Sequence, residues 1–453
     1  MTAEDKTTSA SHLAFNRLIR EESPTADCNR FAVERCEIGN LRARAPTPYA
    51  PAVPSDPARR VLLGFIGQAC FTAATSGVAP KTSLAAGLKE EWVAQPGTDR
   101  ISGCQNFYGR HQSSIVTAQP LAAIVASFDV LAGSRDELTA LMKWLTVATA
   151  ALMAVMMDSL SMTVAFGASM FDTRFGLATQ CPKHLVTMNA FPNDALDNDR
   201  CHGDLLIQFN VDTAETNNQA LQAVLKDFPD GLSLRWRQDR FLLPQTAGAQ
   251  RRDASRNLLG FKDGTSNLDA NSPYLLNRMV WVGNTSGEPG WTHGGTYQAV
   301  RIIRTLVERW NVIPLHEQEN IIGRDKAEGA PLGMAHERDV PDYLGDPDGR
   351  GVPLLAHIRR VNPSDPGSTD SLILRRGYTY SNGLTKAGEL DVGLLFTAFQ
   401  SDLERGFIAV QTRLNGEPLE RHIKPDGGGY FFALPGVEST RDHFARVLLE
   451  TDA

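Results

Sequence analysis

The sequence predicts an α+β protein built from two tandem ferredoxin-like domains, each an antiparallel sheet with peripheral helices. Three observations lead to this fold class. From about residue 105 onward, short strand-like segments alternate with segments of helical spacing. The second half of this region repeats the pattern of the first half. Two similar α+β halves of this size are typical of a duplicated unit.

Composition limits what the chain can be. It has 453 residues, 42% hydrophobic and 21% charged, which is enough for one large core or two ordinary ones. The formal net charge of -7 gives no general basic field, which argues against nucleic acid as a partner. Six cysteines without a CxxC pair indicate neither a disulfide framework nor a structural metal site.

The N-terminal region differs from the rest. Residues 1–54 are polar and rich in Ala and Pro, so we expect a disordered extension. Residues 55–104 are expected to form a twin-arginine signal-like segment and a linker, because Arg59 and Arg60 precede an uncharged stretch. This predicts export to the periplasm, or a cytoplasmic protein if the signal is not functional. A buried or membrane helix is the alternative for this stretch, although its polar residues would anchor it poorly.

No other stable membrane span is expected, because the apolar run around residues 148–157 is too short.

The first domain is expected over residues 105–245 and the second over residues 246–453, joined by a polar loop near residues 240–255. In the first domain we predict strands at Met162–Ala168, Asp204–Val211 and Leu232–Gln238, and a helix at Asn217–Phe228. In the second we predict extended segments at Thr296–Trp310, Ser371–Ser381, Val392–Phe399 and Tyr430–Leu434, and a helix at Arg405–Leu414.

Three short segments carry candidate chemistry. Two glycines flank an aspartate at residues 260–264 (GFKDG), which predicts a tight loop that presents the carboxylate of Asp263. An ordinary Asx turn is the alternative. His357 stands between an apolar stretch and a turn, and Arg375 lies in a strand-like segment. A surface histidine is the alternative for His357.

Together these motifs resemble the dye-decolourising peroxidases, and most closely the periplasmic deferrochelatase/peroxidase branch associated with iron uptake. The resemblance rests on GxxDG at 260–264, HIRxxNP at 357–363, LRRGYxYS at 374–381 and LDVGLLFTAFQ at 390–400. Further segments in family order extend it over residues 105–453.

The resemblance implies a haem b cofactor, iron protoporphyrin IX, with His357 as the iron ligand. Asp391 is the expected hydrogen-bond partner of this imidazole. Asp263 would move the peroxide protons, and it stays a carboxylate at low pH, where a histidine would be protonated. Arg375 would stabilise the developing negative charge.

The resemblance also implies residues that line the haem, for which simple turn chemistry is the alternative: Gly264, Thr265, Ser266, Asn362, Pro363 and Ser364. Arg301 and Arg304 are further candidates for contact with a haem propionate. Trp291 and Tyr380 are candidate surface relays for electrons. His111 and His202 are expected to be structural or pocket-lining.

The expected function is therefore a haem peroxidase that reduces hydrogen peroxide and oxidises bulky phenolic or dye-like donors, with release of iron from haem as an additional activity. The alternative is a haem-binding deferrochelatase with little peroxidase turnover; a third is a protein that kept the fold and lost haem. A homodimer or larger homo-oligomer and iron-uptake partners are expected. The chain is shorter than similar proteins between Leu145 and Met162, so a loop or edge strand is expected to be missing there.

Overall fold

The computed structural model describes residues 106–156, 160–243 and 256–450. The expected extension (1–54), signal-like segment and linker (55–104) and most of the join near 240–255 lie outside these residues. In the first half the elements are β1 (Ala122–Val130), α4 (Arg135–Val155), β2 (Ser161–Gly167), β3 (Leu205–Val211), α5 (Ala214–Asp227) and β4 (Leu232–Phe241).

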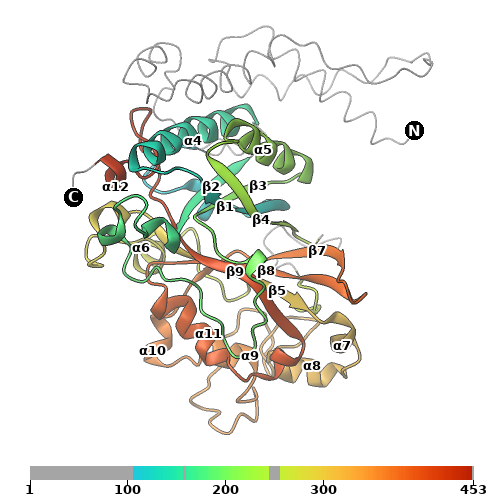
Figure 1. The fold of residues 1–453 in the computed structure, drawn as a ribbon. Coiled ribbons are helices and arrows are strands. Elements are labelled where there is room, and N and C mark those ends of the chain that lie inside the picture. The colour runs from blue at the N-terminus through green and yellow to red at the C-terminus, as the bar shows by residue number, and fades with distance from the viewer. Residues whose placement is uncertain (1–105, 157–159, 244–255, 451–453) are drawn as a thin grey trace, which may run out of the picture. The chain divides into compact units, whose positions relative to one another are not determined.

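The second half contains five strands and several short helices (Figure 1). The strands are β5 (Thr296–Thr305), β6 (Leu374–Arg375), β7 (Tyr378–Leu384), β8 (Leu390–Gln400) and β9 (Ile423–Ala433). The helices are α6 (Pro273–Met279), α7 (Val307–Asn311), α8 (Leu315–Ile322), α9 (His357–Val361), α10 (Pro366–Thr369), α11 (Ala409–Leu414) and α12 (Arg446–Glu450). A π-helical turn, Glu404–Ile408, leads directly into α11.

All nine strands belong to one antiparallel sheet, in the order β5-β9-β2-β3-β1-β4-β7-β8-β6. An additional pairing of β5 with β8 closes this sheet into a barrel. The halves meet at two seams, where β2 pairs with β9 and β4 pairs with β7. The predicted α+β class is confirmed. The two halves do not, however, form two separate sheets, because both seams continue the hydrogen bonding from one half into the other.

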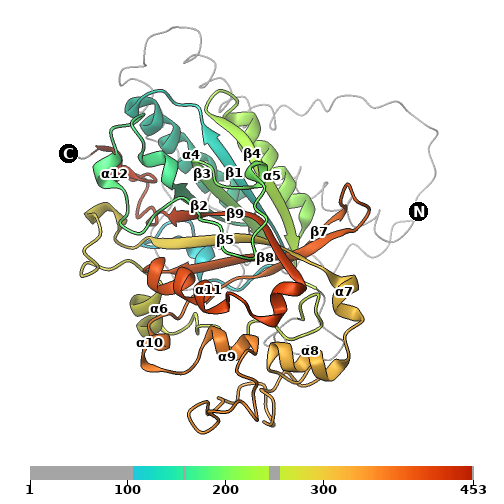
Figure 2. The same cartoon turned by 60° about the horizontal axis from the view of Figure 1, so that its bottom comes forward.

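Helices cover the outside of the barrel. In Figures 1 and 2, α4 and α5 lie together against the strands of the first half, and α8, α9 and α11 gather on the side of β5 and β8. The largest hydrophobic cluster draws on both halves, including Phe128 and Leu145 from the first and Tyr297 and Phe432 from the second. A second cluster, which includes Val125 and Val300, also draws on both halves, so buried apolar contacts join the two halves of the barrel.

Within the described residues, one helix, α4, is long and apolar enough to cross a membrane by length and composition. The apolar run noted at residues 148–157 belongs mostly to this helix, which begins at Arg135. Leu138, Met142 and Leu145 of α4 are buried in the main hydrophobic cluster. These contacts are those of a core helix, with one face against the sheet.

Most predicted elements are present, with three differences. The extended segment expected over Thr296–Trp310 ends at Thr305 and is followed by α7. The segment expected over Ser371–Ser381 is divided into β6 and β7. The last strand begins at Ile423, well before the expected Tyr430. The described residues of the first half form four strands, and the expected shortening between Leu145 and Met162 stays a prediction, since residues 157–159 lie outside them.

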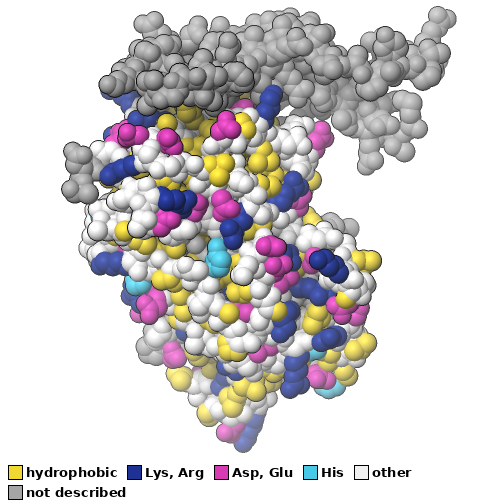
Figure 3. All heavy atoms as spheres, viewed as in Figure 1, with side chains coloured by type: hydrophobic (Ala, Val, Ile, Leu, Met, Phe, Trp, Pro, Cys, Tyr) yellow, Lys and Arg dark blue, Asp and Glu magenta, His cyan; other side chains and the backbone are white. Residues whose placement is uncertain are grey.

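Acidic and basic side chains are interspersed on the face shown in Figure 3. That face has no extended basic patch of the kind that binds nucleic acid.

Candidate active site

His357 is the first residue of α9, and its side chain is anchored by a carboxylate. The Nδ1 atom of His357 lies 2.8 Å from Oε2 of Glu417, whose side chain is only 3% exposed. Burial by itself lowers the pKa of His357, but the charge and hydrogen bond of Glu417 outweigh it, and the net pKa is raised. With Nδ1 bound in this way, Nε2 is the nitrogen left to bind a metal.

Glu417 is not among the residues predicted from the sequence. The expected contact between Asp391 and His357 is wrong, because Asp391 accepts hydrogen bonds from Tyr380 and Asn382 between β7 and β8. A carboxylate in a loop sixty residues after the histidine carries no local signal in the sequence.

Asp263 lies in the loop between two glycines, as the motif predicts. Gly264 has a φ of +90°, a conformation that favours glycine, and open space surrounds the position where its Cβ would be. An oxygen of Asp263 lies 3.9 Å from a guanidinium nitrogen of Arg375, with the two side chains 32% and 28% exposed. Both groups also act on the pKa of His357, so the three side chains are near one another.

Asn267, the last residue of the GFKDGTSN segment, fixes this loop to β6. Its amide donates to the backbone carbonyl of Arg375, and its oxygen accepts from the backbone N–H of Arg375, both at 2.8 Å. Because adjacent residues of an extended segment point to opposite sides, Arg375 and Arg376 point away from each other. The Arg376 guanidinium donates to the carbonyls of Ile115 and Thr117, away from Asp263.

The expected haem-lining residues fall into two loops beside these groups. In the first, Thr265 donates to Glu337 and Ser266 accepts from Arg324. In the second, which follows α9, the Asn362 side chain accepts from the backbone N–H of Ser364 across Pro363. The loops therefore flank Asp263 and His357 respectively.

Two further arginines near the site were not identified from the sequence. Burial lowers the pKa of Arg324, and the nearby charge of Arg375 lowers it further, so two guanidinium groups lie close together here. Arg413 of α11 donates to Ser371 and to the carbonyl of Val361, at the end of α9. The Nε atom of Arg413 is buried and has no hydrogen-bond partner among the described residues.

Other expectations fail because the side chains are engaged elsewhere. Arg301 forms a buried ion pair with Asp194, and Arg304 pairs with Glu389, so neither is placed to bind a propionate. Trp291 and Tyr380 are buried and are not surface relays.

Both remaining histidines have structural contacts. His111 stacks on Trp281 and hydrogen-bonds the carbonyl of Gly294, and the His202 carbonyl accepts from Ser127 and Trp236.

This donor set fits haem. Haem iron needs one protein ligand, which a single anchored imidazole supplies, and its propionates need cations or donors, such as the free Nε–H of Arg413. A metal held by protein alone would need more ligands. Within the part of the chain that the structure describes, no group of three or more His, Cys, Asp or Glu side chains could hold one.

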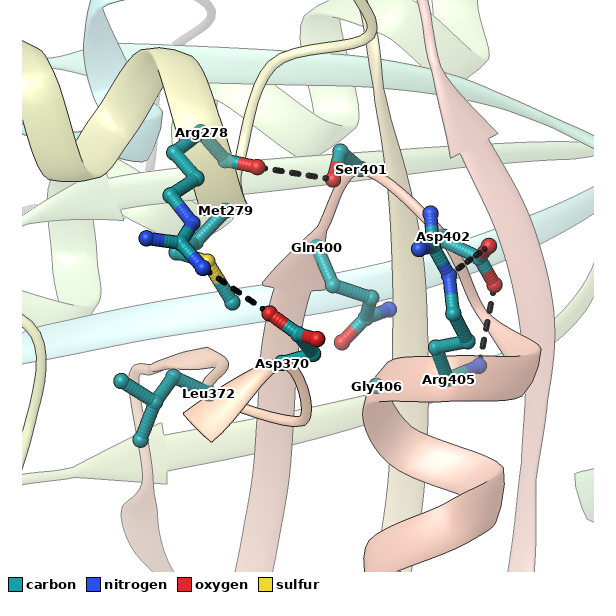
Figure 4. A pocket seen from close by; sticks show the side chains of 9 residues that line it. All are labelled: Arg278, Met279, Asp370, Leu372, Gln400, Ser401, Asp402, Arg405 and Gly406. Carbon is teal, nitrogen blue, oxygen red and sulfur yellow. Dashed lines mark hydrogen bonds and ion pairs between the residues drawn. The ribbon is translucent and has the colours of Figure 1, made fainter. Parts of the chain in front are cut away.

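A separate small pocket of about 140 Å³ lies between α6 and the turn that leads into α11 (Figure 4). Both of its arginines are neutralised, Arg278 by Asp370 and Arg405 by Asp402. None of the predicted site residues lines it. Its charge balance leaves no group free to attract a charged ligand.

Comparison with known proteins follows the same division of the chain. The family model described as Dyp-type peroxidase, N-terminal, matches residues 112–242, and the Dyp-type peroxidase, C-terminal, model matches residues 254–438. The chain is 45% identical over 422 residues to a protein named Deferrochelatase from Shigella flexneri, covering 87% of this chain and 98% of that protein. Deferrochelatase of Escherichia coli K12 is 45% identical over 421 residues, covering 87% and 97%.

Solved structures agree. Ferric DtpA from Streptomyces lividans aligns with a TM-score of 0.71 at 32% identity, covering 77% of this chain and 98% of that chain. A DyP-type peroxidase from Streptomyces coelicolor aligns with a TM-score of 0.70 at 32% identity, covering 79% and 100%.

Proposed function

Because the chain belongs to the Dyp-type peroxidase family, we propose that it is a haem enzyme that reduces hydrogen peroxide and oxidises bulky phenolic or dye-like donors. One observation carries this proposal: a buried carboxylate anchors His357 close to the Asp263–Arg375 pair. A protein that only bound haem would need the histidine and a pocket, but not the other two groups.

His357 would hold the iron through Nε2, while its Nδ1–H donates to Glu417. This hydrogen bond makes the imidazole a stronger electron donor. Arg413 would bind a haem propionate. The rim of the haem would be lined by residues of the two flanking loops: Gly264, Thr265, Ser266, Asn362, Pro363 and Ser364. When bound, haem supplies the iron that takes up peroxide and stores its oxidising equivalents.

Asp263 and Arg375 would act on the peroxide itself. The Asp263 carboxylate accepts a proton from one peroxide oxygen and returns it to the other, which leaves as water when the O–O bond breaks. The Arg375 guanidinium stabilises the negative charge that develops on the oxygens. The two hydrogen bonds between the Asn267 side chain and the backbone of Arg375 hold the loop that carries Asp263 next to the strand that carries Arg375.

The test begins with the visible spectrum of the holoprotein, in which His357→Ala should lose or shift the Soret band. In stopped-flow mixing with peroxide, Asp263→Asn should react about 10²- to 10⁴-fold more slowly than the parent. The rate of the peroxide reaction should fall about 10²- to 10³-fold in Arg375→Leu. Asp269→Asn, an exposed carboxylate six residues downstream, is the matched control. Parent-like rates in the Asp263 or Arg375 variant would refute its role.

A second function is favoured by the relatives named Deferrochelatase. This function is the removal of iron from haem. Two protons replace the iron, so intact protoporphyrin is the product. Incubation with haemin and a ferric chelator should then produce porphyrin fluorescence without cleavage of the ring. Loss of haem absorbance without free porphyrin would exclude it.

The domain boundaries and cellular location complete the proposal. Each half of the sheet has the strand order of a ferredoxin-like unit, β2-β3-β1-β4 and β9-β5-β8-β7, which supports domains at residues 105–245 and 246–453. Arg59 and Arg60 support twin-arginine export to the periplasm. Replacing both with lysine should leave the protein in the cytoplasm, as measured by cell fractionation. Light scattering of the purified holoprotein tests self-association.

A further inference from the structure

A second pocket, of about 240 Å³, lies directly behind the proposed iron ligand. It is formed where α8, the segment before α9 and the 3₁₀ turn Pro418–Arg421 meet. Ala356, the residue before His357, and Pro418, the residue after Glu417, both line it. A molecule in this pocket would therefore lie one residue away from both members of the His357–Glu417 pair.

The wall of this pocket is mainly apolar, with polar groups on one part of it. Ile321 and Leu355 contribute apolar surface, and Leu355 is 52% exposed. Asn320 and His422 contribute polar groups, and Glu317 and Arg421 contribute an acidic and a basic one. An apolar cavity of about 150 Å³ is enough for benzene, so this pocket suits one aromatic ring with substituents. An apolar wall with a few polar groups is the pattern of a small-molecule site.

His422 is the unusual residue here. Its ring packs edge-on against Trp310, with the ring centres 5.3 Å apart. Its Nδ1 is buried, and no group in the described part of the chain hydrogen-bonds the imidazole. Because Nδ1 is closed off from the pocket, Nε2, which is not among the buried unpaired atoms, is the nitrogen that a molecule in the pocket can reach.

Burial lowers the pKa of His422, as do the charges of Arg421 and Arg309, while Glu317 opposes them. The net result is a lowered pKa, which favours the neutral imidazole, the form that can accept a proton.

We propose that this pocket binds the electron donor as a single-ring phenol, with His422 as the acceptor of its proton. The inference rests on the proposed peroxidase function, which supplies the oxidant. The phenol O–H bond would break, with its proton passing to His422. Its electron would leave toward the haem site by way of the Glu417–His357 pair. The phenol leaves as a neutral phenoxyl radical, and His422 returns the proton to solvent. Two such steps consume both oxidising equivalents of one peroxide.

Binding is tested without turnover, using 2-methoxyphenol and the ferric holoprotein. Paramagnetic relaxation of the phenol protons reports their distance from the iron. Asn320→Phe fills the pocket from the exposed face of α8 and should weaken this binding about tenfold or more, a loss of about 1.4 kcal/mol. His316→Phe adds the same ring one turn earlier, outside the pocket, and should leave binding unchanged. Leu355→Trp is a second filling variant if Asn320→Phe folds poorly.

Proton transfer is tested with His422→Phe, which keeps the ring against Trp310. Oxidation of 2-methoxyphenol should slow about a hundredfold, since a positioned proton acceptor contributes 10²–10⁴. Oxidation of ferrocyanide, which gives up an electron without a proton, should not change. Unchanged phenol relaxation in both filling variants, or equal loss with both donors in His422→Phe, would overturn the inference. If only the phenol site is wrong, the parent protein still shows a normal Soret band and a normal reaction with peroxide. If the proposed peroxidase function is wrong, one of these two is absent.

Discussion

At the scale of single residues, Glu417 determines how strongly His357 can donate electrons to iron. The pair is short, and Glu417 is buried, so water does not screen its charge. Glu417→Gln replaces the charge with a neutral amide of the same shape. We expect the haem of this variant to have a higher reduction potential and to react with peroxide about 10- to 100-fold more slowly.

Redox titration and stopped-flow mixing measure the two effects. Asp391→Asn is the matched control, because Asp391 contacts Tyr380 and Asn382 and not His357. A variant of Glu417 with the potential of the parent would show that the carboxylate only positions the ring.

A second residue-scale prediction concerns Asp426. Burial raises its pKa from the usual 3.8 to about 6, with added repulsion from Asp391, while Arg200 opposes the change. Between about pH 4 and 6 the folded state holds a proton that the unfolded state has lost, so stability falls as pH rises through this range. Relative to Asp426→Asn, the parent should lose about 3 kcal/mol from pH 4 to pH 7.

Urea unfolding at both pH values measures this difference. Asp230→Asn, which removes one exposed charge, is the control. The same difference between parent and Asp426→Asn at both pH values would contradict the prediction.

How far the sequence could identify the site depends on how each residue is marked. Asp263, His357 and Arg375 stand in motifs whose glycines, proline and strand pattern are visible locally. Glu417 is visible only in three dimensions, because a turn brings it back to α9. The prediction of Asp391 in its place rests on the family resemblance, which implies an acidic residue in this segment, and the sequence of the segment does not tell where its side chain points.

At the scale of elements, β9 depends on a glycine that permits close approach of two strands. Gly428 has a φ of +122°, and an added Cβ would lie 2.0 Å from the carbonyl oxygen of Val300 on β5. A backbone atom cannot move aside as a flexible side chain can. Gly428→Ala should therefore destabilise the protein by about 3 kcal/mol or more.

Thermal or urea unfolding checks this value. Gly283→Ala is the control, because its Cβ would meet nothing within 4 Å, and it should change stability by less than about 0.5 kcal/mol. A Gly428 variant as stable as that control would mean that β5 and β9 are free to separate.

The same strand shows why element boundaries were only partly predictable. The segment IKPDGGG, which opens β9, has a proline and three glycines and therefore little intrinsic strand preference. Pairing with β5 along its whole length makes it a strand. The strands at Leu205–Val211 and Leu232–Phe241 were predictable because their own apolar and alternating patterns agree with their pairing.

At the scale of the whole molecule, closure of the barrel was not predictable from the sequence. Repetition of the strand and helix pattern indicated two halves. The seams between β2 and β9 and between β4 and β7 join residues more than a hundred positions apart, and no periodic pattern marks them. Buried strands on both sides of a seam are compatible with either separate or joined sheets.

These seams lead to a prediction about how the protein unfolds. Removing one half would expose a strand edge at each seam and much of the shared hydrophobic cluster of the other half, a large loss of buried apolar area. We expect both halves of the holoprotein to unfold together, in one heat-absorption peak. A protease site inserted between residues 244 and 255 allows the two halves to be cut apart while folded. After cleavage they should remain associated on gel filtration and keep the Soret band. Two separate heat-absorption peaks, or a second half that binds haem alone after dissociation, would show instead that each half is an independent folding unit.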